Sequence, residues 1–156
     1  MLRKFLFVSM IAFAFVSCKK DDNESAAQHL TAKFNGTKVD FSTSLAAEKY
    51  YDPSNGYTIS VLGIGGTASN LLPSFDFIVQ SDSEITTKTY SEASDILLAS
   101  YSDTNNGDYN EGDQFTITIT SISATEVRGT FSGKMIKQGS LEVVNVTEGS
   151  FRAPIY

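Results

Sequence analysis

The chain has 156 residues, the length of one ordinary domain, and a formal net charge of −6 at pH 7. An acidic chain repels the phosphates of nucleic acids, and no stripe of basic residues opposes that repulsion, so the composition excludes a nucleic-acid partner. After residue 18 no apolar run is long enough to cross a bilayer as a helix.

Residues 1–17 are typical of an export signal. Arg3 and Lys4 form a short basic start, and an apolar run follows from Phe5 to Val16. A helix of about 12 residues rises about 18 Å, whereas the hydrocarbon core of a bilayer is about 30 Å thick. The run is therefore too short for a membrane span, and we predict a signal peptide that is removed from the mature protein.

The sequence Phe15-Val16-Ser17-Cys18 resembles a bacterial lipobox, in which apolar and small residues precede a cysteine that becomes lipidated. Cys18 is the single cysteine of the chain, so it has no internal disulfide partner. We expect Cys18 to carry two or three acyl chains such as palmitate. Each buried CH₂ contributes about 0.8 kcal/mol, so these chains anchor the protein in a membrane without a transmembrane helix.

Residues 18–28 predict a flexible, solvated tether, because they contain charged and small residues after the cysteine. The Lys-Lys-Asp-Asp stretch that begins at Lys19 is similar to the surface-export signal of Bacteroidetes-type lipoproteins. We expect a cell-envelope protein anchored in the outer membrane. The sequence is compatible with the periplasmic or the external face, and it places a single domain at residues 29–156.

From Leu30 onward, apolar and polar residues alternate with a period of two, which is typical of strands with one buried face. Asn35-Gly36 separates two alternating runs and predicts a hairpin, because both residues tolerate positive φ. The short turn at residues 52–56 favours a second hairpin, so we interpret the ambiguous residues 42–51 as a strand rather than a helix.

The last third alternates most strictly and predicts a three-stranded meander at residues 115–120, 127–135 and 141–146. A short terminal strand is expected at residues 149–151. Between the hairpins and the meander we expect strands at residues 74–80, 85–90 (a short edge strand) and 96–101, and a long polar loop at residues 102–113.

These elements amount to about eight to ten short strands without a strong helical pattern. Tight turns join antiparallel strands, because a parallel crossover needs about a dozen residues. We therefore predict an all-β domain, an antiparallel β-sandwich, with a lipocalin-like closed β-barrel as the alternative. The expected core residues are Phe34, Phe41, Ile59, Val61, Phe75, Phe77, Val79, Ile117, Ile119, Phe131 and Val143.

Four short segments carry a family resemblance: Ala32–Thr37 (AKFNGT), Phe115–Thr118 (FTIT), Val127–Gly133 (VRGTFSG) and Val146–Phe151 (VTEGSF). They resemble the opening and closing motifs of a family of small Bacteroidetes-type lipoproteins of unknown function. The resemblance covers both ends of the domain and leaves its middle unmatched. It implies an all-β fold and brings no catalytic residues.

Catalytic residue types are scarce in the chain. His29 is its single histidine and lies at the end of the tether, and Cys18 is expected to be acylated. A Ser–His or Cys–His mechanism and a zinc site both need more such groups, so we expect no enzyme activity of these kinds and no cofactor. Two carboxylates could hydrolyse a glycoside, but the sequence singles out no pair.

The polar segment from Asp103 to Asp113 is the best candidate for a metal. Asp103, Asn105, Asp108 and Asp113 offer the oxygen ligands that calcium prefers, although their spacing differs from that of an EF-hand loop. The same residue types are common in polar turns.

Several tyrosines could stack on a sugar ring or contact a partner, although tyrosine is equally common in strands. They are Tyr50, Tyr51, Tyr57, Tyr101 and Tyr109. We expect a non-catalytic module that binds a protein or a glycan. The alternatives are a carrier of small apolar ligands in a barrel and a glycoside hydrolase that uses two carboxylates.

Overall fold

The computed structural model describes residues 27–93, 95–112 and 114–156. The expected signal peptide, Cys18 and the tether up to residue 26 lie outside the described residues. Within the described part the regular secondary structure is entirely β, which confirms the predicted fold class. No helix in that part is long and apolar enough to cross a membrane.

Eleven strands build the described fold, against the eight to ten that the sequence predicts. In chain order they are β1 His29–Phe34, β2 Thr37–Asp40, β3 Ser44–Asp52, β4 Gly56–Ile64, β5 Ser74–Ser81, β6 Thr89–Ser91, β7 Ile96–Asp103, β8 Gly107–Glu111, β9 Thr116–Ile122, β10 Glu126–Lys137 and β11 Val143–Pro154.

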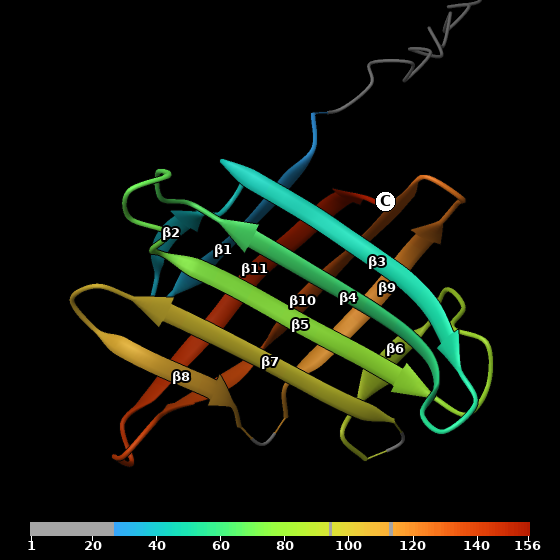
Figure 1. The fold of residues 1–156 in the computed structure, drawn as a ribbon. Coiled ribbons are helices and arrows are strands. Elements are labelled where there is room, and N and C mark those ends of the chain that lie inside the picture. Colours follow the sequence, from blue (N-terminus) through green and yellow to red (C-terminus); the bar gives the residue numbers. More distant parts are fainter. Residues whose placement is uncertain (1–26, 94, 113) are drawn as a thin grey trace, which may run out of the picture.

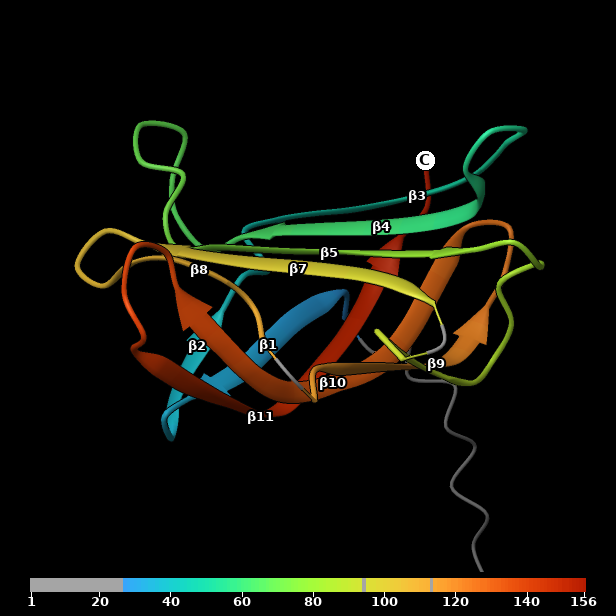
Figure 2. The ribbon, with the colours of Figure 1, turned by 90° about the horizontal axis from the view of Figure 1, so that it is seen from below.

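All strands belong to one antiparallel sheet that curls into two layers (Figures 1 and 2). The order is β2-β1-β11-β10-β8-β7-β5-β4-β3, while β9 pairs with β10 and β6 with β9. We name β3, β4, β5 and β7 the front layer. The back layer consists of β1, β2, β6, β9, β10 and β11. β8 joins the layers, because it pairs with both β7 and β10.

The opposite side of the fold almost closes. Ala47 of β3 forms a bridge with Ile155, and the Tyr156 amide donates a hydrogen bond to the Ala47 carbonyl at 3.2 Å. The architecture therefore combines a sandwich-like pair of layers with the continuous, curled sheet of a half-open barrel.

Both predicted hairpins are present. Asn35 and Gly36 have φ values of 48° and 85°, so the β1–β2 turn uses the positive φ that these residues tolerate. The ambiguous residues 42–51 form most of β3, which pairs with β4 over its whole length. The segment forms a strand rather than a helix because the three-residue connection at residues 53–55 places β3 directly beside β4.

The prediction of a polar loop at residues 102–113 is wrong. The segment contains a tight turn and then β8, whose Tyr109 side chain is buried. Asp103 makes this turn possible: its Oδ1 accepts hydrogen bonds from the amides of Asn105 and Asn106 at 2.8 and 3.0 Å. Asp and Asn signal such a turn as readily as a loop, and the short strand beyond it carries few apolar residues.

Two smaller strand predictions also need correction. β6 covers three residues instead of residues 85–90, because Ile85 turns into the core. The strands expected at residues 141–146 and 149–151 are one strand, β11, which continues through an irregularity at Glu148, where φ is 52°. A bulge of this kind bends a strand without ending it.

The core lies between the two layers and is built largely from aromatic rings. Phe75 and Phe131 stack across it with ring centroids 4.7 Å apart, and Phe77 meets Phe151 at 5.0 Å. Ten of the eleven expected core residues are buried. Val143 is the exception: it is 43% exposed, and its neighbour Val144 is buried instead, at 8% exposed. The sequence does not distinguish the two, because in a run of two valines either one can face the core.

The glycine-rich motifs near the C-terminus have a packing role. Gly129 pairs with Phe151 across β10 and β11, and Phe131 pairs with Gly149. A Cβ atom on Gly129 would lie 2.6 Å from Phe151 Cζ, and one on Gly149 would lie 2.6 Å from Phe131 Cδ2. Each glycine therefore gives the opposite ring the space to lie over the backbone of the neighbouring strand.

Candidate functional site

Two clefts lie at opposite ends of the front layer, since β7 begins beside one and ends at the other. We name them the tyrosine cleft and the acidic cleft. The tyrosine cleft has a volume of ≈ 280 Å³ and gathers the β1–β2 turn, the β7–β8 turn and the segment before β11. Its lining residues are Phe34, Asn35, Thr37, Val39, Tyr101, Asp103, Asn106, Tyr109, Glu142 and Val144.

Three aromatic rings form the wall of the tyrosine cleft. Phe34 at the end of β1 stacks on Tyr101 of β7 with centroids 4.1 Å apart, and the Tyr101 and Tyr109 rings are 5.7 Å apart. These residues are buried, with exposed fractions of 3–6%. The rings therefore pack on one another and fix the shape of the wall.

Each tyrosine hydroxyl holds a carboxylate at the cleft. Tyr101 donates to Asp103 Oδ2 at 3.2 Å, and Tyr109 donates to Glu142 Oε1 at 3.3 Å. Burial raises the pKa of Tyr101, and the negative charge and hydrogen bond of Asp103 raise it further. Burial and Glu142 also raise the pKa of Tyr109. Both phenols therefore stay protonated and keep donating at neutral pH.

Asp103 has a structural role besides lining the cleft. Its Oδ1 accepts a third hydrogen bond, from Asn106 Nδ2 at 2.9 Å, in addition to those from the two turn amides. Of the other calcium candidates, Asn105 and Asp108 lie in the same hairpin and Asp113 lies outside the described residues. In the described part no three His, Cys, Asp or Glu side chains gather as they would around a metal ion.

The Lys137 ammonium lies beside the tyrosine cleft. Lys137 Nζ is 3.3 Å from Glu142 Oε2 and 5.9 Å from the centroid of the Tyr109 ring. Lys137 is thus a neighbour of only one of the two carboxylates that line the cleft, and the charge balance there is negative.

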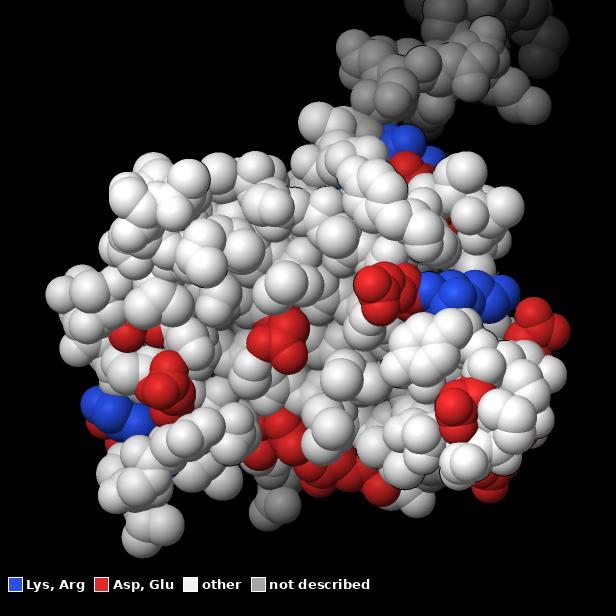
Figure 3. All heavy atoms as spheres, viewed as in Figure 1, with Lys and Arg blue, Asp and Glu red and all other residues white. Residues whose placement is uncertain are grey.

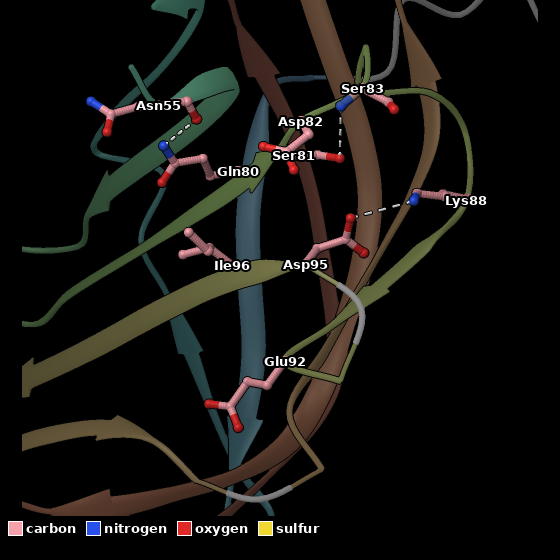
Figure 4. A pocket seen from close by; sticks show the side chains of 9 residues that line it. All are labelled: Asn55, Gln80, Ser81, Asp82, Ser83, Lys88, Glu92, Asp95 and Ile96. Atoms are coloured by element: carbon pink, nitrogen blue, oxygen red, sulfur yellow. Dashed lines mark hydrogen bonds and ion pairs between the residues drawn. The ribbon is translucent and has the colours of Figure 1, made fainter. Parts of the chain in front are cut away.

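The acidic cleft, of ≈ 520 Å³, lies at the other end of the front layer (Figure 4). Lys88 and Asp95 point toward each other, 3.5 Å apart, and Lys88 Nζ also lies 4.5 Å from the Tyr90 ring centroid. The side chain of Asp95 is only 4% exposed. The cleft is lined by Asn55, Gln80, Ser81, Asp82, Ser83, Lys88, Glu92, Asp95 and Ile96.

The other residues singled out from the sequence lie away from the tyrosine cleft. His29 begins β1, opposite Arg152, and its Nδ1 lies 3.0 Å from the Ala27 carbonyl oxygen. Tyr50 and Tyr51 are 50% and 59% exposed at the β3–β4 hairpin. Of the five candidate tyrosines, the fold brings only Tyr101 and Tyr109 into this cleft.

On the exposed face of the front layer, charged side chains are scattered among uncharged areas, and acidic groups outnumber basic ones (Figure 3). Leu62, Ile96 and Leu98 are about half exposed there, at 46%, 54% and 48%.

No family model, curated protein or solved structure matches this chain. The resemblance to the Bacteroidetes-type lipoprotein family therefore remains a prediction from the sequence motifs.

Proposed function

We propose that this chain is a lipid-anchored, non-catalytic binding module of the cell envelope, held in the outer membrane by acyl chains on Cys18. The short apolar leader, the lipobox and the charged tether support the anchor. The all-β domain supports the binding role, because a rigid sheet presents the turns at its ends as recognition surfaces.

The tyrosine cleft carries the proposal. β1 begins at His29, next to the tether, and ends at Phe34 in the cleft wall. Six strand residues span about 20 Å, so the cleft lies at the opposite end of β1 from the residue that follows the tether. Its polar groups come from three separate segments and are held in place by the packed rings.

The structure supports the two alternative functions less well. A carrier of apolar ligands needs a hollow interior, whereas the space between the layers is occupied by stacked rings such as Phe75 and Phe131. A two-carboxylate hydrolase could use Asp103 and Glu142, which share the cleft. However, three N–H groups already bind Asp103 Oδ1, so this carboxylate oxygen serves to hold the turn.

Site-specific photocrosslinking in intact cells tests the binding role. A benzoylphenylalanine replaces Thr37 at the exposed rim of the cleft, and a matched variant carries it at Ala124, which is exposed in the β9–β10 turn. We expect an envelope component to be crosslinked from position 37 and not from position 124. Equal labelling from both positions, or none from position 37, would contradict the proposal.

A further inference from the structure

We propose that the tyrosine cleft binds one ring of a neutral saccharide. This inference rests on the proposed function and specifies the ligand of the same site. It depends on three properties of the cleft: its size, its mixture of hydrogen-bonding groups and its charge.

The size fits a single sugar ring. Pockets for drug-sized ligands measure about 300–1,000 Å³, and the tyrosine cleft, at ≈ 280 Å³, is slightly smaller than that range, so it suits one ring rather than a larger ligand. The β1–β2 turn, the β7–β8 turn and the segment before β11 border it, so a longer glycan could continue outward from the bound ring.

The hydrogen-bonding groups match hydroxyls, which both donate and accept. Besides the hydrogen bonds that they already receive, the carboxylates of Asp103 and Glu142 keep lone pairs that can accept. Asn35 Oδ1 accepts from the Asn145 amide at 2.9 Å and Asn106 Nδ2 donates to Asp103 at 2.9 Å, which leaves the Asn35 Nδ2 group as a donor and Asn106 Oδ1 as an acceptor. Tyr101 and Tyr109 already hold the two carboxylates, so little ordering is needed when a ligand binds.

An apolar surface lies beside these polar groups. Val39 is half-buried and Val144 is 8% exposed, and both line the cleft. A sugar ring has C–H groups on its faces and hydroxyls around its rim, so it can contact the valines while its hydroxyls reach the polar groups. A fully polar ligand would leave the valine side unused.

The charge of the cleft selects against ionised sugars. Asp103 and Glu142 repel uronates, sialic acids and sugar phosphates. Glu142 is already paired with Lys137, whose Nζ lies 3.3 Å away. A neutral ligand avoids the repulsion that an anion meets and gains charge-assisted hydrogen bonds from its hydroxyls to the carboxylates.

Saturation-transfer NMR on the full mature chain in detergent micelles tests the inference. The probes are methyl glycosides of glucose, galactose, mannose and N-acetylglucosamine, with glucuronate as the anionic comparison. Glu142→Gln removes a charged acceptor whose side chain is 59% exposed, so the fold tolerates the change. Glu84→Gln is the matched control, because Glu84 is 65% exposed and also pairs with a lysine, at the other end of the molecule.

We expect at least one neutral glycoside to bind with a millimolar dissociation constant and glucuronate to bind more weakly. Glu142→Gln should weaken the neutral glycoside about tenfold, and Glu84→Gln should leave it unchanged. Equal affinity in wild type and Glu142→Gln would overturn the assignment to this cleft. Absence of saccharide binding, with crosslinking from position 37 intact, would overturn the ligand class but leave the binding function. Loss of both would overturn the two proposals together.

Discussion

Replacing Gly149 by Ala tests whether the reciprocal glycine–phenylalanine pairs hold β10 and β11 together. The added Cβ would lie 2.3 Å from the Phe131 carbonyl oxygen and 2.6 Å from Phe131 Cδ2, well inside the ordinary contact distance of about 3.5–4.0 Å. Because the nearest atom belongs to the backbone, a side-chain rotation cannot relieve the clash, and the two strands must separate.

The sign of the change in stability shows whether the added methyl group meets free space or a clash. In a site with free space, Gly→Ala stabilises a protein by about 0.4–1 kcal/mol, because the unfolded chain loses conformational freedom. Overpacking in a core costs about 1–3 kcal/mol. We therefore expect Gly149→Ala to lower the free energy of unfolding by about 1–2 kcal/mol.

Urea unfolding followed by circular dichroism measures this change. With a slope of about 2 kcal/mol per molar urea, the midpoint should fall by roughly 0.5–1 M. Ser132→Ala is the control, because Ser132 is exposed in β10, and it should change the stability by less than about 0.5 kcal/mol. An unchanged or raised midpoint for Gly149→Ala would refute the packing role that we assign to the motif.

Three further predictions follow from the structure. Val144→Ala should lower the free energy of unfolding by about 1–2 kcal/mol, and Val143→Ala by less than half of that, because Val144 is the buried one of the two. Equal losses in urea unfolding would contradict the assignment of Val144 to the buried face of β11. Burial acts to raise the pKa of Glu126, but hydrogen bonds from Arg152 and Arg128 outweigh it and hold the pKa below its usual range. Glu126 therefore stabilises the fold at a pH above its pKa in the unfolded chain, and this stabilisation is lost as the pH falls through its pKa in the folded chain. Glu126→Gln should flatten the acid side of a stability–pH curve measured by urea unfolding. A curve that shifts downward in parallel at every pH would argue against this role. Calcium should leave the thermal midpoint unchanged relative to chelator, because Asp103 is held by turn N–H groups, and a rise of several degrees would show that the hairpin binds the ion.

Most of the fold follows from local patterns in the sequence. Asn35-Gly36 determines a turn by its own conformational preference, and strict alternation in β9 and β10 assigns the buried face directly. The errors arise where the local signal is shared by two structures. Asp103 and its neighbours form the same polar pattern in a loop and in a tight hairpin, and only pairing with β7 and β10 distinguishes them.

The candidate site was less accessible from sequence. Tyr101, Tyr109 and Asp103 were already candidates, but for separate reasons, and nothing local joined them to Phe34 or Glu142. These residues meet because β1 and β11 are neighbours in the back layer and the curl of the sheet brings β7 of the front layer to the same end, which is a consequence of long-range pairing. Patterns of neighbouring residues predict the turns, whereas the cleft forms only when strands that are distant in sequence pair into the curled sheet.

The lipid anchor is the central claim, and intact-mass spectrometry of the protein extracted from the membranes of its own cells tests it most directly. The account predicts a chain that begins at Cys18 and carries the added mass of two or three acyl chains. A chain that still contains residues 1–17, or one that begins at Cys18 with an unmodified thiol, would contradict it.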